Sequence, residues 1–375
     1  MCLLGGPGCP GVLVAKKRLL PPPSVAPTAS GGGTVFFVTR DSHRYLSNRE
    51  EREEGGTPGV VGDIRMGLVM HLKQSIGPAW IEQQELETAR KVHARLSANP
   101  AIHLLGHPHP ESVSGAPQGR FLPIVSFLIQ PLGTTRCLHY NFVSALLNDL
   151  FGVQSRGGCM CAGPYAQLLL GIPSSIDLDV DDSDDSYKEL NSHFSSLNGA
   201  IENAVLDKHE MFRPGFTRLS LPYFMSEEKI DYIVRAIEFI AAKGALFLSM
   251  YRHNHRTGEC AHTTRLTKFP ERKWLTSFDF IHDDSPEPVA SEANEKEIFD
   301  GMFAAAEKEA ARIQAENVKK LKKKGSGAVV STGMHNGHEN VRWFLTNADF
   351  PQSLPTVPDE TVSSDLSLRR PLEGK

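Results

Sequence analysis

The sequence has few cysteines, no long apolar run and no marked excess of one charge. Its six cysteines, in 375 residues, lack the spacing of a disulfide framework, which favours a reducing compartment. No apolar stretch is long enough to span a bilayer, and no segment resembles a signal peptide. A formal net charge of −4 creates no field that attracts nucleic acid. We therefore expect a cytoplasmic protein, or an organelle-matrix protein if an upstream transit peptide exists, without a membrane or nucleic-acid partner.

Segments of helical and strand-like periodicity alternate through the first two thirds of the chain, which indicates an α/β architecture. The predicted strands are 11–17, 34–38, 101–106, 121–129 and 216–221. The predicted helices are 60–76, 81–99, 138–152, 164–172 and 226–244, the last with Ser226 as its cap. A long charged helix with a thin apolar stripe is expected up to residue 324, and residues 325–375, rich in Gly, Ser and Pro, are expected to be disordered.

The segment "SRGGCMCAGPY", residues 155–165, places Cys159 and Cys161 one residue apart. A disulfide between them is disfavoured, because so short a ring strains the S–S geometry. A zinc site would need four ligands, and further candidates occur at Cys137, His139, Cys260 and His262. None of these pairs has the usual two-residue spacing, so we predict no metal site.

A nucleophilic cysteine fits the neighbours of this motif better. Glycines before the cysteine allow close approach of a ligand to the backbone, and Arg156 supplies a permanent cation that can bind a carboxylate. A cysteine that acts as a thiolate needs such support. The alternative, that Cys159 and Cys161 are small apolar residues of the core, stays open at this point.

A second glycine-rich segment, "EEGGTPG" at 53–59, contains Gly56 and Thr57. Backbone N–H groups and a threonine hydroxyl in such a loop can bind an anion. Ordinary turn chemistry explains the same composition, so this motif alone does not predict a site.

Taken in order, five segments resemble the class V aminotransferases, in their cysteine desulfurase and selenocysteine lyase branch. The segments are "GGPGCPGVLVAKK", "GGGTVFFV", "EREEGGTPGVVGDIRMGL", "SRGGCMCAGPY" and "TRLSLPYFMSEEKIDYIVRAIEFI". The resemblance covers residues 1 to about 245 and the latter half of such an enzyme. It implies a pyridoxal-phosphate-dependent transferase fold of type I, with residues 1–75 as a remnant of the large domain and 76–245 as the small C-terminal domain. Residues 246–324 would form an extension, followed by the tail at 325–375.

The resemblance also implies roles for individual residues. Cys161, five residues after Arg156, would be the active-site cysteine that takes the substrate sulfur as a persulfide. Arg156 and Arg218 would bind the carboxylate of an amino acid substrate, and Gly56 with Thr57 would bind the phosphate of pyridoxal 5′-phosphate in the other subunit of a homodimer. Cys159 stands where the family varies.

The family binds its cofactor through a lysine just before the "GGPG" turn, at a position that would lie at or before Met1 here. In that register Cys2 falls roughly where the lysine belongs, and Lys16 and Lys17 follow the predicted strand. We therefore expect a chain without the anchoring lysine, which corresponds to an incomplete desulfurase. The alternative is a catalytically inactive interaction module that pairs with a full-length relative.

Overall fold

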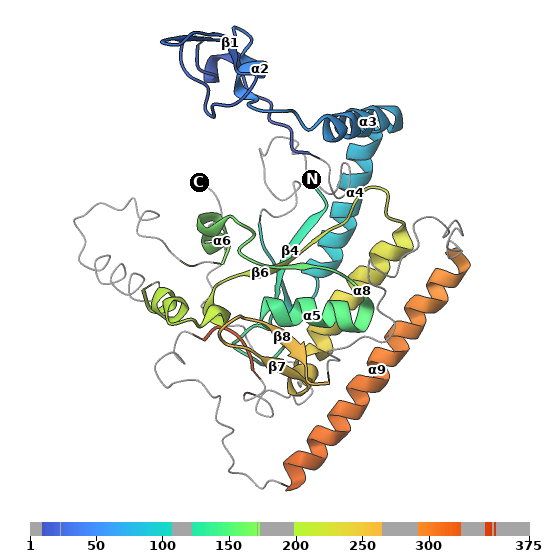
Figure 1. Cartoon of the computed structure of the whole chain (residues 1–375). Coiled ribbons are helices and arrows are strands. Elements are labelled where there is room, and N and C mark those ends of the chain that lie inside the picture. Colours follow the sequence, from blue (N-terminus) through green and yellow to red (C-terminus); the bar gives the residue numbers. More distant parts are fainter. Residues whose placement is uncertain are drawn as a thin grey trace, which may run out of the picture. The chain divides into compact units, whose positions relative to one another are not determined.

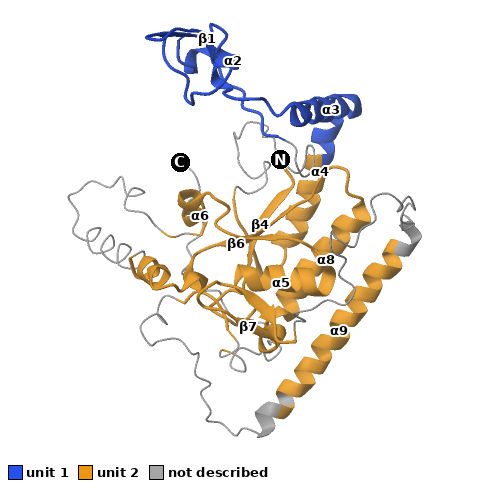
Figure 2. Ribbon diagram, viewed as in Figure 1, with its two compact units in different colours: residues 1–84 blue, residues 85–375 orange. Residues whose placement is uncertain are grey.

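The computed structural model describes residues 10–22, 24–106, 122–170, 172, 199–264, 292–323, 342–346 and 349. Its contacts divide the chain into two compact units, residues 1–84 and 85–375 (Figure 2). The boundary expected between residues 75 and 76 falls a few residues earlier than this division. The difference arises because the helix α4, Pro78–Ser97, crosses from one unit to the other.

The first unit holds a two-stranded antiparallel hairpin followed by α-helices (Figure 1). The hairpin consists of β1 (Val35–Val38) and β2 (His43–Tyr45), and the 3-10 turn η1 (Lys17–Leu19) precedes it. The helix α2 (Arg49–Glu53) follows, with the Asn48 side chain accepting a hydrogen bond from the Glu50 amide, and α3 spans Val60–Ile76. The strand predicted at 34–38 and the helix predicted at 60–76 are confirmed.

The strand predicted at 11–17 is wrong. Residues 11–16 are irregular and exposed, and η1 begins at Lys17. A strand needs a partner for its backbone groups, and none of the strands in the described part of the chain pairs with this segment. The β-branched composition that suggested a strand therefore did not decide the local conformation. Cys2 and the "GGPG" turn lie outside the described residues.

The second unit is built on a four-stranded antiparallel sheet with strand order β3-β4-β6-β5. Its strands are β3 (Ile102–Leu104), β4 (Ile124–Ile129), β5 (Arg156–Gly158) and β6 (Phe216–Ser220). The strands predicted at 101–106, 121–129 and 216–221 are confirmed. The sheet brings the cysteine motif at its edge beside the arginine-bearing strand β6, although the two are about 60 residues apart in sequence.

Three helices predicted from the sequence are found in this unit, namely α5 (Tyr140–Phe151), α6 (Gly163–Leu169) and α8 (Glu227–Lys243). Gly152 ends α5 with a left-handed φ of 63°, a conformation that glycine adopts without strain. The Ser226 hydroxyl caps α8 by accepting the Lys229 amide at 3.3 Å. The end of α5 and the start of α8 are therefore each determined by one residue that can be recognised in the sequence.

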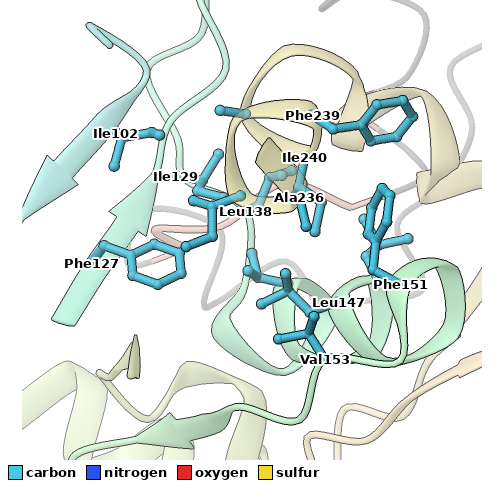
Figure 3. Packing of buried hydrophobic residues seen from close by; sticks show 14 of the residues in the cluster. Ile102, Phe127, Ile129, Leu138, Leu147, Phe151, Val153, Ala236, Phe239 and Ile240 are labelled. Atoms are coloured by element: carbon cyan, nitrogen blue, oxygen red, sulfur yellow. The ribbon is translucent and has the colours of Figure 1, made fainter. Parts of the chain in front are cut away.

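The main core lies between α5, α8 and one face of the sheet (Figure 3). Phe127 and Ile129 of β4 face Leu147 and Phe151 of α5 and Ile240 of α8 (Figure 3). These side chains are 2% exposed or less. Alternate residues of a strand point to opposite faces of the sheet, so the other face remains available for polar side chains.

The segment after α8 continues through η4 (Gly244–Met250) and an antiparallel hairpin of β7 (Tyr251–His253) and β8 (Cys260–His262). The long helix α9 (Glu292–Lys323) packs against α5, α8 and η4, with Ala306, Ala310 and Ile313 buried (Figure 1). Its ion pairs with α8 include Lys229–Glu295 at 2.9 Å and Arg235–Asp300 at 3.6 Å. The described residues of the extension expected at 246–324 fall within the second unit.

A short piece of the C-terminal tail also packs on the second unit. The sequence placed residues 342–346 in a segment expected to be disordered, yet Arg342, Phe344, Leu345 and Thr346 are buried. Phe344 forms an isolated parallel bridge with Cys137. The low apolar content of residues 325–375 as a whole concealed this local aromatic anchor. Among the described residues, no helix is long and apolar enough to cross a membrane.

Candidate active site around Cys161

The strands β5 and β6 bring two arginines together. Arg156 of β5 is the direct register partner of Arg218 of β6 in the antiparallel pair. Side chains directly opposite each other in such a pair lie on the same face of the sheet. Arg156 is exposed and Arg218 half-buried, whereas Thr217 and Leu219 next to it are buried. The two guanidinium groups therefore share the face opposite the helical core.

Cys161 lies in a tight turn that follows β5. The Ala162 amide donates to the Cys159 carbonyl at 3.1 Å, which closes the turn over Met160 and Cys161. Both central residues have positive φ, 58° for Met160 and 61° for Cys161. This conformation costs free energy in residues that have a Cβ, and it is concentrated at functional sites. The turn holds the Cys161 side chain on the surface, where it is exposed.

Arg156 contacts the sulfur of Cys161 directly. Its Nη2 donates to Cys161 Sγ at 3.1 Å. A guanidinium at this distance interacts more favourably with a sulfur that carries negative charge than with a neutral one. The structure thus brings together Cys161, Arg156 and Arg218, three residues that the resemblance assigned to one site.

The ring of Tyr140, a residue that sequence reasoning missed, packs closely against Gly157 of β5 and Gly215, which precedes β6. An added Cβ at Gly157 would lie 2.6 Å from Tyr140 Cδ2, and one at Gly215 would lie 2.7 Å from Tyr140 Cε1. Both positions must therefore be glycine while the ring stays in place. Burial raises the pKa of Tyr140 to about 12, so the phenol stays neutral, and its hydroxyl donates to the Arg213 carbonyl at 3.3 Å.

His139 begins α5 immediately before this tyrosine. Its Nδ1 accepts a hydrogen bond from the Asn141 amide at 3.1 Å, which caps the helix. The proton of the neutral ring is therefore on Nε2, which donates to the Met211 carbonyl at 3.1 Å. Burial lowers the pKa of His139 to about 3. His139 is thus a neutral structural residue. The only indication of this role in the sequence is that His139 stands at the start of a segment with helical periodicity.

The other described cysteines have different surroundings. Cys159 is half-buried at the start of the turn, while Cys137 is buried and Cys260 half-buried. Burial raises the pKa of both Cys137 and Cys260 to about 12, which makes them poor nucleophiles. Within the described part of the chain, no group of three or more His, Cys, Asp or Glu side chains could hold a metal ion.

The "GGT" loop lies in the first unit, whereas Cys161 belongs to the second. Gly56 has a φ of 98°, and its amide donates to the Gly32 carbonyl at 2.8 Å. Gly31 and Gly55 approach so closely that an added Cβ at Gly31 would lie 3.0 Å from Gly55 Cα. Thr57 is exposed. The loop therefore presents the Thr57 hydroxyl outward, whereas the Gly56 N–H is already used within the unit.

Side chains of α2 hold this loop in place. Arg52 is fully buried and donates from Nη2 to the Pro21 carbonyl at 2.5 Å. The Glu53 carboxylate accepts the Thr28 amide at 3.0 Å, and this bond lowers the pKa of Glu53. Both contacts tie the residues before Gly56 to the segment 21–28.

Comparison with known proteins supports the resemblance. Residues 3–172 match the family model of the class V aminotransferases. This region of the chain is class V aminotransferase-like. The match includes both the "GGT" loop and the Cys161 turn, and it supports the expected pyridoxal-phosphate fold of type I. None of the curated proteins compared with the chain matches it.

The solved structures that the chain resembles include two cysteine desulfurases. One is the apo cysteine desulfurase of Thermococcus onnurineus NA1, with 21% identity over 57% of this chain and 39% of that one, at a TM-score of 0.38. The other is the cysteine desulfurase CsdA (S-sulfonic acid) of Escherichia coli, with 18% identity over 60% of this chain and 40% of that one, at a TM-score of 0.37. The chain therefore spans about two fifths of the length of these structures.

Proposed function

We propose that the chain belongs to a pyridoxal-phosphate-dependent, cysteine desulfurase-like protein in which Cys161 receives sulfur from an amino acid. The observation that carries the proposal is the 3.1 Å contact of Arg156 Nη2 with the exposed Cys161 Sγ, in a turn with two residues of positive φ. Cys161, as a thiolate, would form a bond to the substrate sulfur while the carbon–sulfur bond of the substrate breaks. The electron pair of that bond would stay on the carbon, which takes up a proton and leaves as the desulfurised amino acid. The product is a persulfide on Cys161, from which a thiol reductant releases sulfide.

The arginine pair would orient the substrate. Two guanidinium groups on one face of the sheet, at the register pair Arg156–Arg218, suit the two oxygens of a carboxylate. Arg218 is half-buried, so it offers a firmer contact than an exposed side chain would. In this arrangement Arg156 would contact both the Cys161 sulfur and the substrate carboxylate. It would thereby hold the substrate close to the reactive sulfur.

The described residues fit one part of a pyridoxal 5′-phosphate site. The exposed Thr57 hydroxyl, held by the glycine-rich loop, is suited to donate to the phosphate, while Gly56 contributes its positive φ rather than its N–H. When bound, the cofactor supplies an electron sink that weakens bonds at the substrate Cα and Cβ. Thr57 would act on the cofactor of the other subunit, so the proposal includes a homodimer or a pair with a full-length relative.

An inactive interaction module is the second candidate, and the surface of the first unit favours it. The large apolar side chains of α3 are exposed, among them Val61 at 75%, Ile64 at 60% and Leu68 at 66%. Apolar surface of this extent is typical of sites that bind another protein. In this alternative the chain would pair with a full-length relative through the first unit and would not turn over substrate itself.

Sulfur transfer to the two cysteines of the turn separates these possibilities. The full chain would be incubated with pyridoxal phosphate, L-cysteine and a reductant, both alone and mixed with a full-length relative whose own active-site cysteine has been replaced by alanine. Because this chain is expected to lack the anchoring lysine, we expect sulfide release and a persulfide on Cys161, detected by mass spectrometry, in the mixture. Cys161→Ala should abolish both, whereas the matched control Cys159→Ala should retain most of the release.

Each other outcome has a definite meaning. Equal loss in both variants would show that the turn has a structural role and that Cys161 is not the acceptor. Absence of the Cys161 persulfide in the chain alone and in the mixture, together with stable association in native mass spectrometry, would establish the interaction module. A visible absorbance that borohydride bleaches, with a stoichiometric adduct on one lysine of this chain, would overturn the expectation of an incomplete desulfurase, because the chain would then supply its own cofactor anchor.

A further inference from the structure

A short C-terminal segment packs beside the residues that lead into α5. We call residues 342–346 the C-terminal strap. The Cys137 amide donates to the Trp343 carbonyl at 3.1 Å, and the Leu345 amide donates to the Cys137 carbonyl at 2.8 Å. Phe344, between them, is fully buried. The strap is thus fixed beside the residues that lead into α5, although it lies outside the family match at residues 3–172.

The Trp343 side chain continues this contact onto the start of α5. Its ring stacks on His139, with centroids 5.3 Å apart, and on Tyr140, at 6.0 Å. The two interplanar angles are 25° and 21°. The indole Nε1 donates to the Phe212 carbonyl at 3.2 Å. Trp343 therefore joins α5 to the segment that enters β6.

Tyr140 transmits this packing to the strands that hold the site. Its ring lies where any side chain at Gly157 or Gly215 would collide with it. Gly157 precedes the turn by two residues, and Gly215 precedes β6, which carries Arg218. A rotated or displaced Tyr140 ring would leave space beneath both strands. Both strands carry residues of the site, because Arg156 directly precedes Gly157 in β5 and Arg218 lies in β6.

We propose that Trp343, stacked on Tyr140 beneath Gly157 and Gly215, is a positioning residue that holds the Arg156–Cys161 contact. Trp343 is remote in sequence and acts through the tyrosine ring rather than on the substrate. The proposal rests on the proposed function only in taking Cys161 as the reactive thiol. It implies that the C-terminal strap helps to position the residues of the site.

The pH profile of Cys161 alkylation tests this role without any turnover. Iodoacetamide modification of Cys161 is followed by peptide mass spectrometry in the full chain at pH 7 and pH 9.5. Solvent access to Cys161 affects both rates equally, so it drops out of the ratio of the pH 7 rate to the pH 9.5 rate. The ratio therefore reports how much of the reactive thiolate form is present near neutral pH. We expect Trp343→Ala to lower this ratio about threefold or more, in the same direction as Arg156→Gln.

Conservative variants distinguish positioning from stability. Trp343→Phe retains a stacking ring and should restore most of the ratio, whereas Trp343→Leu retains only apolar volume and should not. Trp80→Ala, a tryptophan of the first unit, serves as the matched control and should leave the ratio unchanged. Melting temperatures of all variants separate loss of folding from loss of positioning. If Trp343→Ala does not fold, the alkylation-rate ratio measured in Trp343→Leu decides whether Trp343 positions the site.

The possible results are distinct. A wild-type ratio in folded Trp343→Ala or Trp343→Leu, even with a lower melting temperature, would overturn the positioning role. If Cys161 in the wild type reacts no faster than Cys159 at pH 7, the proposed nucleophile fails. The response of the Cys161 ratio to the Trp343 variants would still be measured and would decide the positioning role separately.

Discussion

The two units differ in where their apolar side chains lie. In residues 85–375, two buried clusters contain nearly all of the buried apolar side chains, from Val92 to Leu345. In residues 1–84, Ile81 is buried, while two thirds of the exposed large apolar side chains of the described residues belong to this smaller unit. Burial of apolar surface is the main favourable term in folding. The second unit can thus be stable by itself, whereas the first has apolar surface suited to a partner.

A cavity in the core of the second unit should have the largest effect. Phe142 is fully buried and packs edge-to-face on Tyr251, with centroids 5.2 Å apart. Phe142→Ala should lower the free energy of unfolding by about 3–5 kcal/mol, measured by urea denaturation. Phe37→Ala, at a side chain of the first unit that is 61% exposed, should change it by less than about 0.5 kcal/mol. Similar losses in both variants would remove the distinction between the units.

The ion pair at the C-terminal strap should give the next largest effect. The Arg342 side chain is 1% exposed and its Nη2 donates to Asp349 at 2.8 Å. Burial alone would raise the pKa of Asp349, but the bonds from Arg342 and Thr346 outweigh it and lower the pKa. Asp349→Asn removes the negative charge that contacts the buried guanidinium, so we expect a loss of about 2 kcal/mol in unfolding free energy.

A matched substitution at an exposed pair provides the control for Asp349. Asp300 pairs with Arg235 at 3.6 Å, and both side chains are well exposed, at 55% and 38%. Asp300→Asn should cost less than about 0.5 kcal/mol, because water screens such pairs. If Asp349→Asn were equally mild, the strap would not be an integral part of the second unit.

Periodicity predicted helices in both units, but the strand predicted at 11–17 in the first unit is wrong, and the sequence did not predict which unit buries its apolar side chains. Periodicity identified α3 and α8 alike, and the caps at Ser226 and Gly152 marked helix ends because they act within a few residues. The strap could not be predicted, since its contacts with Cys137 join residues about 200 positions apart. At the site, the motif order indicated Cys161 and Arg156, but the register of β5 with β6 was needed to place Arg218 beside them. The role of Tyr140 depends on Gly157 and Gly215, which are far apart in sequence, so no local pattern could reveal it.

Acidification should weaken the second unit through its buried histidines. Burial lowers the pKa of His139 to about 3 and that of His253 to about 4, from an ordinary value of 6.5. The unfolded chain therefore binds protons below pH 6.5 that the folded chain does not bind until about pH 3 or 4. Stability is fully present above pH 6.5 and is lost as the pH falls through this window, by up to ~1.4 kcal/mol per pH unit for each histidine.

Substitution of His139 isolates its share of this dependence. Asn can also cap a helix, so His139→Asn should retain α5 while removing one titrating group. We expect urea denaturation between pH 6.5 and 5.0 to show a slope smaller by about 1 kcal/mol per pH unit than that of the wild type. An unchanged slope would mean that His139 binds its proton equally well in the folded and unfolded states.

The smallest effect on stability is expected on α3, where the effect on association should be clear instead. Leu68 and Ile64 are 66% and 60% exposed, so Leu68→Ser and Ile64→Ser remove little buried area within the chain. Each should change the free energy of unfolding by less than about 0.5 kcal/mol. In sedimentation velocity, both should shift the protein toward the monomer relative to wild type, because they remove apolar surface from a partner-binding face. Gln74→Ser, at an exposed polar position of the same helix, should change neither quantity. If either apolar variant lost more than about 2 kcal/mol of unfolding free energy, α3 would have to be packed within the chain. The first unit would then bury its own apolar surface, as the second unit does.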